Sequence, residues 1–212
     1  MTRHLLARSE RVVAVEIDAR LVGVLKETFR NEDRLTVVHA DVLETDLGQW
    51  GPAVVAGNLP YYVTSPILQK ILALGSLLRR AVLLIQKEVA ERLAAVPGTR
   101  NYGFLTVETK LLATPEILFQ VPPDAFDPPP KVNSAVVRFL IRAPEKAWAI
   151  DDPARFLTFV GHCFRQKRKT LRNNLAGIYG KALVEAWPEA SLRAEQLSIE
   201  QFAGLYRRLR AC

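Results

Sequence analysis

The sequence has 212 residues, enough for one ordinary domain or for one domain with a small appendage. Hydrophobic residues make up 49% and charged residues 24%, which is typical of a globular protein with a substantial core. The formal charge of +7 favours an anionic partner, with nucleic acid ahead of a membrane surface. No apolar run approaches the ~20 residues needed to cross a bilayer, and charges at positions 8, 10 and 11 interrupt the apolar N-terminal stretch, which argues against a signal peptide.

The cysteines and histidines exclude two further classes. Cys163 and Cys212 make no disulfide framework and no metal-binding spacing, so the reducing cytoplasm is the expected setting. The three histidines stand far apart in the sequence and suggest neither a catalytic triad nor a metal site.

The first two-thirds of the chain alternates between strand and helix patterns. The valine-rich run 11–18 predicts a strand buried on both faces, and Leu21, Leu25 and Phe29 predict the apolar face of a helix over 19–30. Further strands are expected at 35–41, 53–57, 81–86, 116–121 and 134–140. Further helices are expected at 87–96, at 104–113 and after a cap at Thr64 or Ser65, the last with Pro66 in its first turn and an apolar stripe over 67–72. This alternation predicts an α/β fold with a mostly parallel sheet covered on both faces, the last two strands being antiparallel.

The composition changes after Arg142. Residues 143–146 are typical of a linker, and beyond them only helix patterns are convincing. Ser198 and Gln201 have the spacing of a capping box at the start of the last helix. We therefore expect a sheet-containing domain over 1–142 and a small all-helical domain over 147–212.

Three predicted parallel strands end in polar residues: Glu16 and Asp18 after the first, Asp41 after the second and Asn58 after the third. In such sheets ligands bind at the carboxyl ends of the strands, so these side chains are expected to point into one crevice. Glu16 is placed to accept the hydroxyls of a ribose and Asp41 to accept an adenine amino group. Each acid on its own is equally compatible with a solvated strand end.

The stretch VVAGNLPYYV, residues 54–63, follows a strand with an amide, a proline and two tyrosines. The side-chain oxygen of Asn58 and the carbonyl of Leu59 are suited to accept both protons of an adenine amine, which frees the nitrogen lone pair. Pro60 stiffens the loop, and Tyr61 is suited to stack on the base. The alternative is a plain strand-to-helix turn, because Asn and Pro are common turn residues.

A second loop, 122–133, carries Phe126 among five prolines and then Lys131. Proline fixes the backbone, so an aromatic ring there is presented with little loss of entropy. Phe126 is suited to contact the other face of a flipped base. The alternative is a rigid surface loop whose aromatic ring packs onto the core.

The stretch FRQKRKTLRNNL, residues 164–175, holds five basic residues and no acid. On a helix these residues are expected to cover one broad face suited to phosphate contacts, although charge runs are more often simply solvated. The five residues are Arg165, Lys167, Arg168, Lys169 and Arg172.

Together, NLPYYVTSPIL, the VEID and HADVL strand ends, AFDPPPKVNSAVVRF, FRQKRKTLRNNL and LSIEQFAGLYRRL closely resemble the ribosomal small-subunit RNA adenine N6,N6-dimethyltransferases. The likeness covers nearly the whole chain. It implies a Rossmann-like S-adenosylmethionine-dependent methyltransferase sheet and a C-terminal helical domain that binds RNA. It implies transfer of methyl groups from S-adenosylmethionine to two adjacent adenines in a hairpin near the 3′ end of small-subunit rRNA. The implied substrate is an immature subunit particle, the implied role includes checking subunit assembly, and a monomer is expected.

The resemblance also assigns residues. The target-base set is Asn58, Leu59, Pro60, Tyr61 and Phe126; the cofactor-binding set is Glu16, Asp41, Val42 and Asn58; the RNA-binding set is Lys131, Arg165, Lys167, Arg168, Lys169 and Arg172.

The sequence departs from the family at its start. The family's fold begins with a central strand and a glycine-rich turn that hold the methionine end of the cofactor, whereas Gly23 is the first glycine here and no such turn precedes Glu16. The chain as written is expected to bind S-adenosylmethionine weakly or not at all, and to expose an unpaired edge beside its second and fourth strands.

Three alternative functions stay open. They are a non-catalytic rRNA-binding assembly factor, a large-subunit rRNA methyltransferase of the antibiotic-resistance type and a DNA adenine methyltransferase. The helical domain disfavours the last two.

Overall fold

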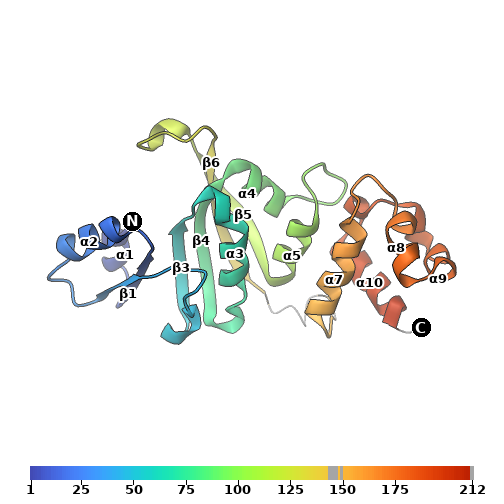
Figure 1. Ribbon diagram of the computed structural model, residues 1–212, viewed down its shortest axis with the longest axis horizontal. Helices are drawn as coiled ribbons and strands as arrows, with labels where there is room; N and C mark the ends of the chain where they lie inside the picture. Colours follow the sequence, from blue (N-terminus) through green and yellow to red (C-terminus); the bar gives the residue numbers. More distant parts are fainter. Residues whose placement is uncertain (143–147, 149, 211–212) are drawn as a thin grey trace. The chain divides into compact units, whose positions relative to one another are not determined.

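The computed structural model describes residues 1–142, 148 and 150–210 (Figure 1). The chain forms two compact units, Met1–Gly51 and Pro52–Cys212. The expected linker at 143–146 lies outside the described residues, as does the expected start of the helical domain at 147, so the division at that point stays a prediction. None of the described helices has the length and apolar character of a membrane-spanning segment.

The first unit is a two-stranded parallel sheet with its connecting helix. Its elements are α1 (Thr2–Leu6), β1 (Val12–Glu16), α2 (Ala19–Thr28), β2 (Leu35–His39) and the short helix η1 (Leu47–Trp50). Strands β1 and β2 pair from Val12 with Leu35 to Glu16 with His39, so both strands end at the same edge. Among the described residues β2 is the only strand that pairs with β1.

Helix α2 differs in one detail from the predicted apolar face. Leu21 is 46% exposed, whereas Val22 is 6% exposed and is the residue that α2 buries. Leu25 and Phe29 are half-buried as expected. The inward face therefore follows the spacing Val22, Leu25, Phe29, which is three and then four residues and fits a helix as well as the predicted spacing does.

The second unit contains a four-stranded sheet in the order β3-β4-β6-β5. The strands are β3 (Ala53–Asn58), β4 (Leu78–Gln86), β5 (Ala113–Val121) and β6 (Ser134–Ile141). Strand β3 is parallel to β4, and β6 is antiparallel to both β4 and β5. These bounds agree with the predicted strands, and the antiparallel pair confirms the expectation for the last two. Among the described residues β3 has β4 as its sole partner.

Helices connect the strands of this sheet. They are η2 (Tyr61–Val63), α3 (Thr64–Leu72), η3 (Gly75–Leu77), α4 (Lys87–Ala94), α5 (Phe104–Leu112) and η4 (Pro123–Ala125). Helix α5 also caps the end of α4: the Thr106 hydroxyl donates to the Arg92 carbonyl at 2.6 Å and the Lys110 ammonium to the Ala95 carbonyl at 2.6 Å. These side chains thereby supply hydrogen bonds to carbonyls at the C-terminal end of α4.

The C-terminal region is helical, as predicted. It contains α7 (Pro153–Phe164), α8 (Leu171–Tyr179), α9 (Lys181–Glu185), η5 (Pro188–Ser191), η6 (Ala194–Gln196) and α10 (Ile199–Arg210). Its core includes Phe156, Phe159 and Phe202, and the same core takes in Val107 and Leu111 of α5. Figure 1 shows α7 beside α5. The helical region therefore shares buried apolar surface with α5 of the sheet-bearing part of this unit.

Two side-chain caps stabilise this region. The capping box holds: the Gln201 side chain accepts from the Ser198 amide at 2.9 Å, and the Ser198 hydroxyl accepts from the Gln201 amide at 3.3 Å. Buried Asn174 of α8 closes the end of α7, since its amide nitrogen donates to the Cys163 carbonyl at 2.9 Å and its oxygen accepts from the Gln166 amide at 3.2 Å. One amide side chain thus joins two helices through backbone groups that would otherwise be unpaired.

Replacing Asn174 by alanine is expected to lower the free energy of unfolding by about 2–3 kcal/mol, because buried backbone groups lose their partner. Urea unfolding followed by the fluorescence of Trp187, which packs in the same core, measures the change. Asn173→Ala is the matched control, since that asparagine is exposed and has no described side-chain hydrogen bond; its effect should stay within about 0.5 kcal/mol. Equal losses in the two variants would contradict the role of Asn174.

Candidate functional site

The loop after β3 presents Asn58 at the edge of the four-stranded sheet. Asn58 pairs with Leu84 as the last residue of β3. The next amide, that of Leu59, donates to the Leu84 carbonyl at 3.1 Å, and the Leu59 side chain is 8% exposed. The Asn58 residue itself is exposed, and its side-chain amide has no hydrogen bond within the described part of the chain. The fold therefore fixes the backbone here and leaves the amide group available to a ligand.

The two tyrosines that follow have different surroundings. Tyr61 is half-buried, and its hydroxyl lies 2.6 Å from that of Ser134. Tyr62 is 88% exposed. The backbone of this turn is tied locally, since the Val63 amide and the Thr64 hydroxyl both donate to the Pro60 carbonyl at 3.2 Å. Of the two rings, Tyr61 is thus the one held by a bond to the sheet, and Tyr62 is exposed to solvent.

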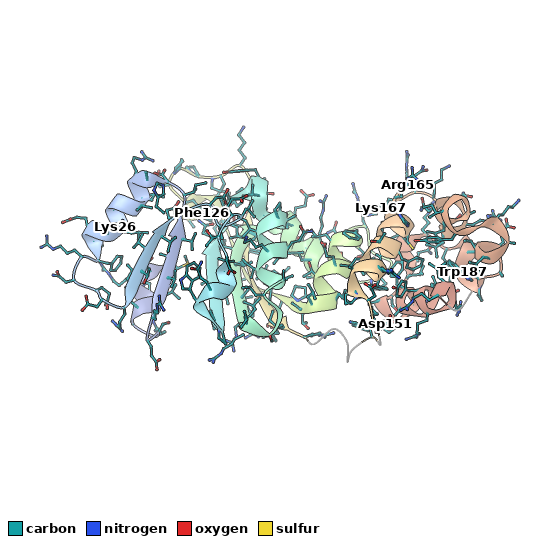
Figure 2. All side chains as sticks on the ribbon, turned by 60° about the horizontal axis from the view of Figure 1, so that its bottom comes forward. Lys26, Phe126, Asp151, Arg165, Lys167 and Trp187 are labelled. Carbon is teal, nitrogen blue, oxygen red and sulfur yellow. The ribbon has the colours of Figure 1, made fainter. Side chains whose placement is uncertain are left out.

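The proline-rich loop 122–133 begins and ends at the same edge of the sheet as Asn58. Its two flanking residues, Val121 and Ser134, pair with each other, and Ser134 pairs in turn with Gln86 at the end of β4. Phe126 lies on this loop and is half-buried, and the loop extends beyond the strands (Figures 1 and 2). Lys131 is exposed and has no described partner. The sheet thus gathers both predicted base-binding loops at one edge.

The first unit holds the two predicted cofactor carboxylates at the ends of its paired strands. Glu16 pairs with His39, and Asp41 follows two residues later. One Glu16 oxygen accepts from the Asp18 amide at 2.9 Å, and one Asp41 oxygen accepts from the Leu43 amide at 2.8 Å. These bonds fix the orientation of each carboxylate and leave its second oxygen without a described bond. Val42 follows Asp41 and is half-buried.

Asp18, which the sequence groups with Glu16 as a polar strand end, has a structural role. Its carboxylate accepts from the Arg20 amide at 2.8 Å and the Leu21 amide at 3.4 Å, and it caps α2. The hydrogen bond from the Arg20 amide is the main cause that holds the pKa of Asp18 below its usual value. Asp18 therefore orders the turn after β1 instead of facing a ligand.

Four of the five basic residues of the segment 164–175 lie on a turn, and the fifth, Arg172, lies in the first turn of α8. Helix α7 ends at Phe164 and α8 begins at Leu171, so the prediction that 165–169 continue a helix is wrong (Figure 2). The buried amide of Asn174 also accepts the Gln166 backbone amide and donates to its carbonyl at 3.2 Å, which closes the turn in place of helical bonds. Four basic side chains of this segment are exposed with no described partner: Arg165, Arg168, Lys169 and Arg172.

Lys167 differs from its basic neighbours because its ammonium group has partners within the protein. Its ammonium donates to the Arg100 carbonyl at 2.6 Å and lies 3.6 Å from the Glu195 carboxylate. The Glu195 carbonyl in turn accepts the Gly98 amide at 2.7 Å. Lys167 thus ties the connection between α4 and α5 to the helical region. Cys163 is fully buried, and burial raises the pKa of its thiol, in agreement with a core position.

The structural roles of three residues, Tyr61, Lys167 and Asn174, could not be predicted from the sequence. The bond between Tyr61 and Ser134 joins residues 73 positions apart, and Lys167 reaches Arg100 across 67 positions. Asn174 lies inside a quoted motif, but nothing in the sequence distinguishes it from the exposed Asn173. Only the capping boxes and strand ends have a local signal.

Two features, each within its own unit, are typical of a Rossmann-like methyltransferase: an available amide, a proline and an aromatic ring after the parallel strand β3, and carboxylates after the parallel strands β1 and β2. A family model described as ribosomal RNA adenine dimethylase matches residues 1–210. The chain belongs to that family. The enzyme class expected from the sequence, an S-adenosylmethionine-dependent rRNA adenine dimethyltransferase, is thereby confirmed.

Curated relatives agree with this membership. The chain is 43% identical over 220 residues to ribosomal RNA small subunit methyltransferase A of Acidobacterium capsulatum, an alignment that covers 99% of this chain and 77% of that protein. It is 40% identical over 223 residues to the protein of the same name from Streptococcus pneumoniae serotype 2, strain D39, with 97% and 77% covered.

Solved structures agree as well. A dimethyladenosine transferase from Plasmodium falciparum superposes with a TM-score of 0.83 at 25% identity, covering 99% of this chain and 86% of that one. The 23S rRNA methyltransferase ErmE superposes with a TM-score of 0.74 at 29% identity, with the same coverage. The predicted Rossmann-like fold class is therefore confirmed.

Proposed function

We propose that the protein transfers methyl groups from S-adenosylmethionine to N6 of two adjacent adenines near the 3′ end of small-subunit rRNA, within an immature subunit. The observation that supports this most directly is the exposed, unpaired amide of Asn58 at the end of β3, in a chain of this family. The small subunit is favoured over the large because the relatives named for it are 40–43% identical, against 29% for the 23S enzyme. We further propose that the enzyme works as a monomer in the cytoplasm and takes part in checking subunit assembly.

The target adenine is proposed to bind in the loop Asn58–Tyr61. The Asn58 side-chain oxygen and the Leu59 carbonyl accept the two protons of the amine, which draws the nitrogen toward tetrahedral geometry and exposes its lone pair. A neutral amide is sufficient, because the amine proton leaves after the methyl group arrives. Pro60 restricts the backbone, while Tyr61 and Phe126 contact the two faces of the base.

The cofactor is proposed to bind at the carboxyl ends of β1 and β2. Bound S-adenosylmethionine supplies an electrophilic methyl group. The free oxygen of Glu16 accepts ribose hydroxyls, and that of Asp41 accepts the adenine amino group, with Val42 beside it. The chemistry fits, because both carboxylates are oriented by one backbone bond and retain acceptor capacity. Asn58 is proposed to touch the cofactor as well as the target amine.

The RNA backbone is proposed to bind along the exposed basic residues. These are Lys131, Arg165, Arg168, Lys169 and Arg172, none of which has a described partner. Lys167, predicted with them, is bonded to Arg100 and Glu195 and is proposed to support the turn that presents them. Phosphate contacts of this kind supply affinity and register, while the loop Asn58–Tyr61 selects the base.

In a version of the protein that includes the family's N-terminal strand and glycine-rich turn, Asn58→Ala is expected to lower kcat for methyl transfer to immature subunits by roughly a hundredfold or more, because an acceptor that acts on the reacting amine is lost. Binding of S-adenosylmethionine should remain, since Glu16 and Asp41 supply its charged contacts. A radiolabelled methyl-transfer assay and a cofactor titration measure the two effects. Asn31→Ala, at an exposed asparagine in the first unit, is the control. Either unchanged turnover or a loss of cofactor binding in Asn58→Ala would refute the role of Asn58.

Glu16→Gln and Asp41→Asn are each expected to raise KM for S-adenosylmethionine by about tenfold or more, because a charge-assisted hydrogen bond to the cofactor is lost. The dependence of the transfer rate on cofactor concentration measures this change. Glu44→Gln removes the same charge from an exposed side chain three residues after Asp41 and should leave KM unaltered. If all three variants behave alike, general electrostatics explains the effect and the two carboxylates are not ligands.

The double variant Arg168→Gln/Lys169→Gln is expected to weaken particle binding and to flatten its salt dependence. The slope of log K against log[salt] should fall by roughly 0.7–0.9 for each phosphate contact removed. Filter binding at several salt concentrations measures the slope. Arg79→Gln/Arg80→Gln removes the same two charges at the start of β4, away from Gln86, and should keep the original slope. An unchanged slope in the first variant would identify the turn as a solvated surface.

A further inference from the structure

The hydroxyl of Tyr61 has a specific partner inside the sheet. It lies 2.6 Å from the Ser134 hydroxyl, and either group is able to donate. Ser134 is fully buried, whereas Tyr61 is half-buried. The bond therefore runs from the site loop into the protein interior, where an unpaired hydroxyl would be costly.

Ser134 is held rigidly by the strands around it. As the first residue of β6 it pairs with Gln86 of β4 on one side and with Val121 of β5 on the other. The carbonyl of the preceding Asn133 accepts the Lys87 amide at 2.9 Å. Ser134 thus has its backbone paired with a strand on each side and its side chain fully buried, which restricts where its hydroxyl lies.

The Tyr61 ring has no comparable anchor of its own. Backbone bonds fix the loop at Leu59 and at Pro60, but they leave the rotation of the Tyr61 side chain free. Within the described residues, the bond to Ser134 is the one hydrogen bond that the Tyr61 hydroxyl makes. Tyr62, next in the chain, has no such bond and is 88% exposed. Within the described residues the two tyrosines therefore differ both in burial and in the hydrogen bond to Ser134.

We propose that Ser134 is a positioning residue of the methyl-transfer reaction: by holding the Tyr61 hydroxyl it sets the plane of the ring against which the target adenine stacks. This inference rests on the proposed role of Tyr61 at the target base. Ser134 also ends the proline-rich loop that carries Phe126, so one buried hydroxyl links the two loops that contact the base. Small errors in such an orientation lower the rate strongly, because the reacting groups must be aligned within a fraction of an ångström.

The test is a double-mutant cycle on the methyl-transfer reaction. Ser134→Ala and Tyr61→Phe each remove the bond, one from the buried side and one from the loop side. Each is expected to lower kcat/KM for the immature subunit by roughly tenfold, with KM for S-adenosylmethionine unchanged. The double variant should lose no more than either single variant, because both remove the same interaction. Additive losses would overturn the proposal.

Two matched controls separate positioning from general damage. Tyr62→Phe removes a hydroxyl with no described partner and should keep the wild-type rate. Ser134→Thr retains the hydroxyl and should restore most of the rate that Ser134→Ala loses. If the buried substitutions fail to fold, judged by circular dichroism, Tyr61→Phe alone decides: a wild-type rate in that variant overturns the proposal.

A readout independent of activity follows the ring itself. The protein has five tyrosines, and 3-fluorotyrosine labelling with Tyr→Phe variants assigns each ¹⁹F resonance. Ser134→Ala is expected to shift and sharpen the Tyr61 resonance and to leave that of Tyr62 in place. A lower rate without a change at Tyr61, or a change at Tyr61 without a lower rate, overturns the proposal. Failure of Asn58→Ala to affect transfer would instead refute the proposed function, so the two failures are distinguishable.

Discussion

The hydrogen bonding of β4 on both of its edges is the constraint on which the target-base region depends. A parallel partner, β3, ends opposite Leu84, two residues before the end of β4, and an antiparallel partner, β6, begins opposite Gln86 at that end. Asn58 and Ser134 consequently lie at the same end of the sheet, although they are 76 residues apart in the sequence. Ala81, Leu83 and Ile85 of β4 are fully buried, so a slip of one residue would turn this apolar set to the wrong face. The core that stabilises the fold thereby also fixes the register of the site.

The loops at this edge combine a fixed backbone with available side chains. Leu59 is buried and bonded to β4, while the neighbouring Asn58 side-chain amide has no hydrogen bond to any other described residue. A rigid scaffold that positions a few loop residues is a common basis for binding and catalysis. The same division applies to the tyrosines, where one ring is tied to the sheet and the next is exposed to solvent.

The basic turn depends on a different set of contacts. Apolar side chains of α5, α7 and α10 share one core, and Asn174 and Lys167 add polar bonds that close the turn and connect it to the sheet-bearing part of the unit. This support presents the exposed side chains of Arg165, Arg168 and Lys169, which we propose contact RNA phosphates.

The sequence was sufficient to predict those features that depend on residues close together in the chain. Valine-rich runs located the strands, the spacing of Phe202, Leu205 and Leu209 located the buried face of the last helix, and the motifs identified the family. Local pattern failed where competing local bonds mattered: Asp18 caps a helix, and the run 165–169 forms a turn because the Asn174 side chain replaces helical bonds.

What the sequence alone determined, then, is the order of the elements, the family and the residue types offered to base, cofactor and phosphate, because each depends on neighbours within a few positions. Only the tertiary structure decided which of these side chains stay free and which the protein binds itself. Tyr61 meets Ser134 and Lys167 meets Arg100 solely because strand pairing and a shared core bring distant segments together. Hydrogen bonds between such segments have no signature in the spacing of residues along the chain.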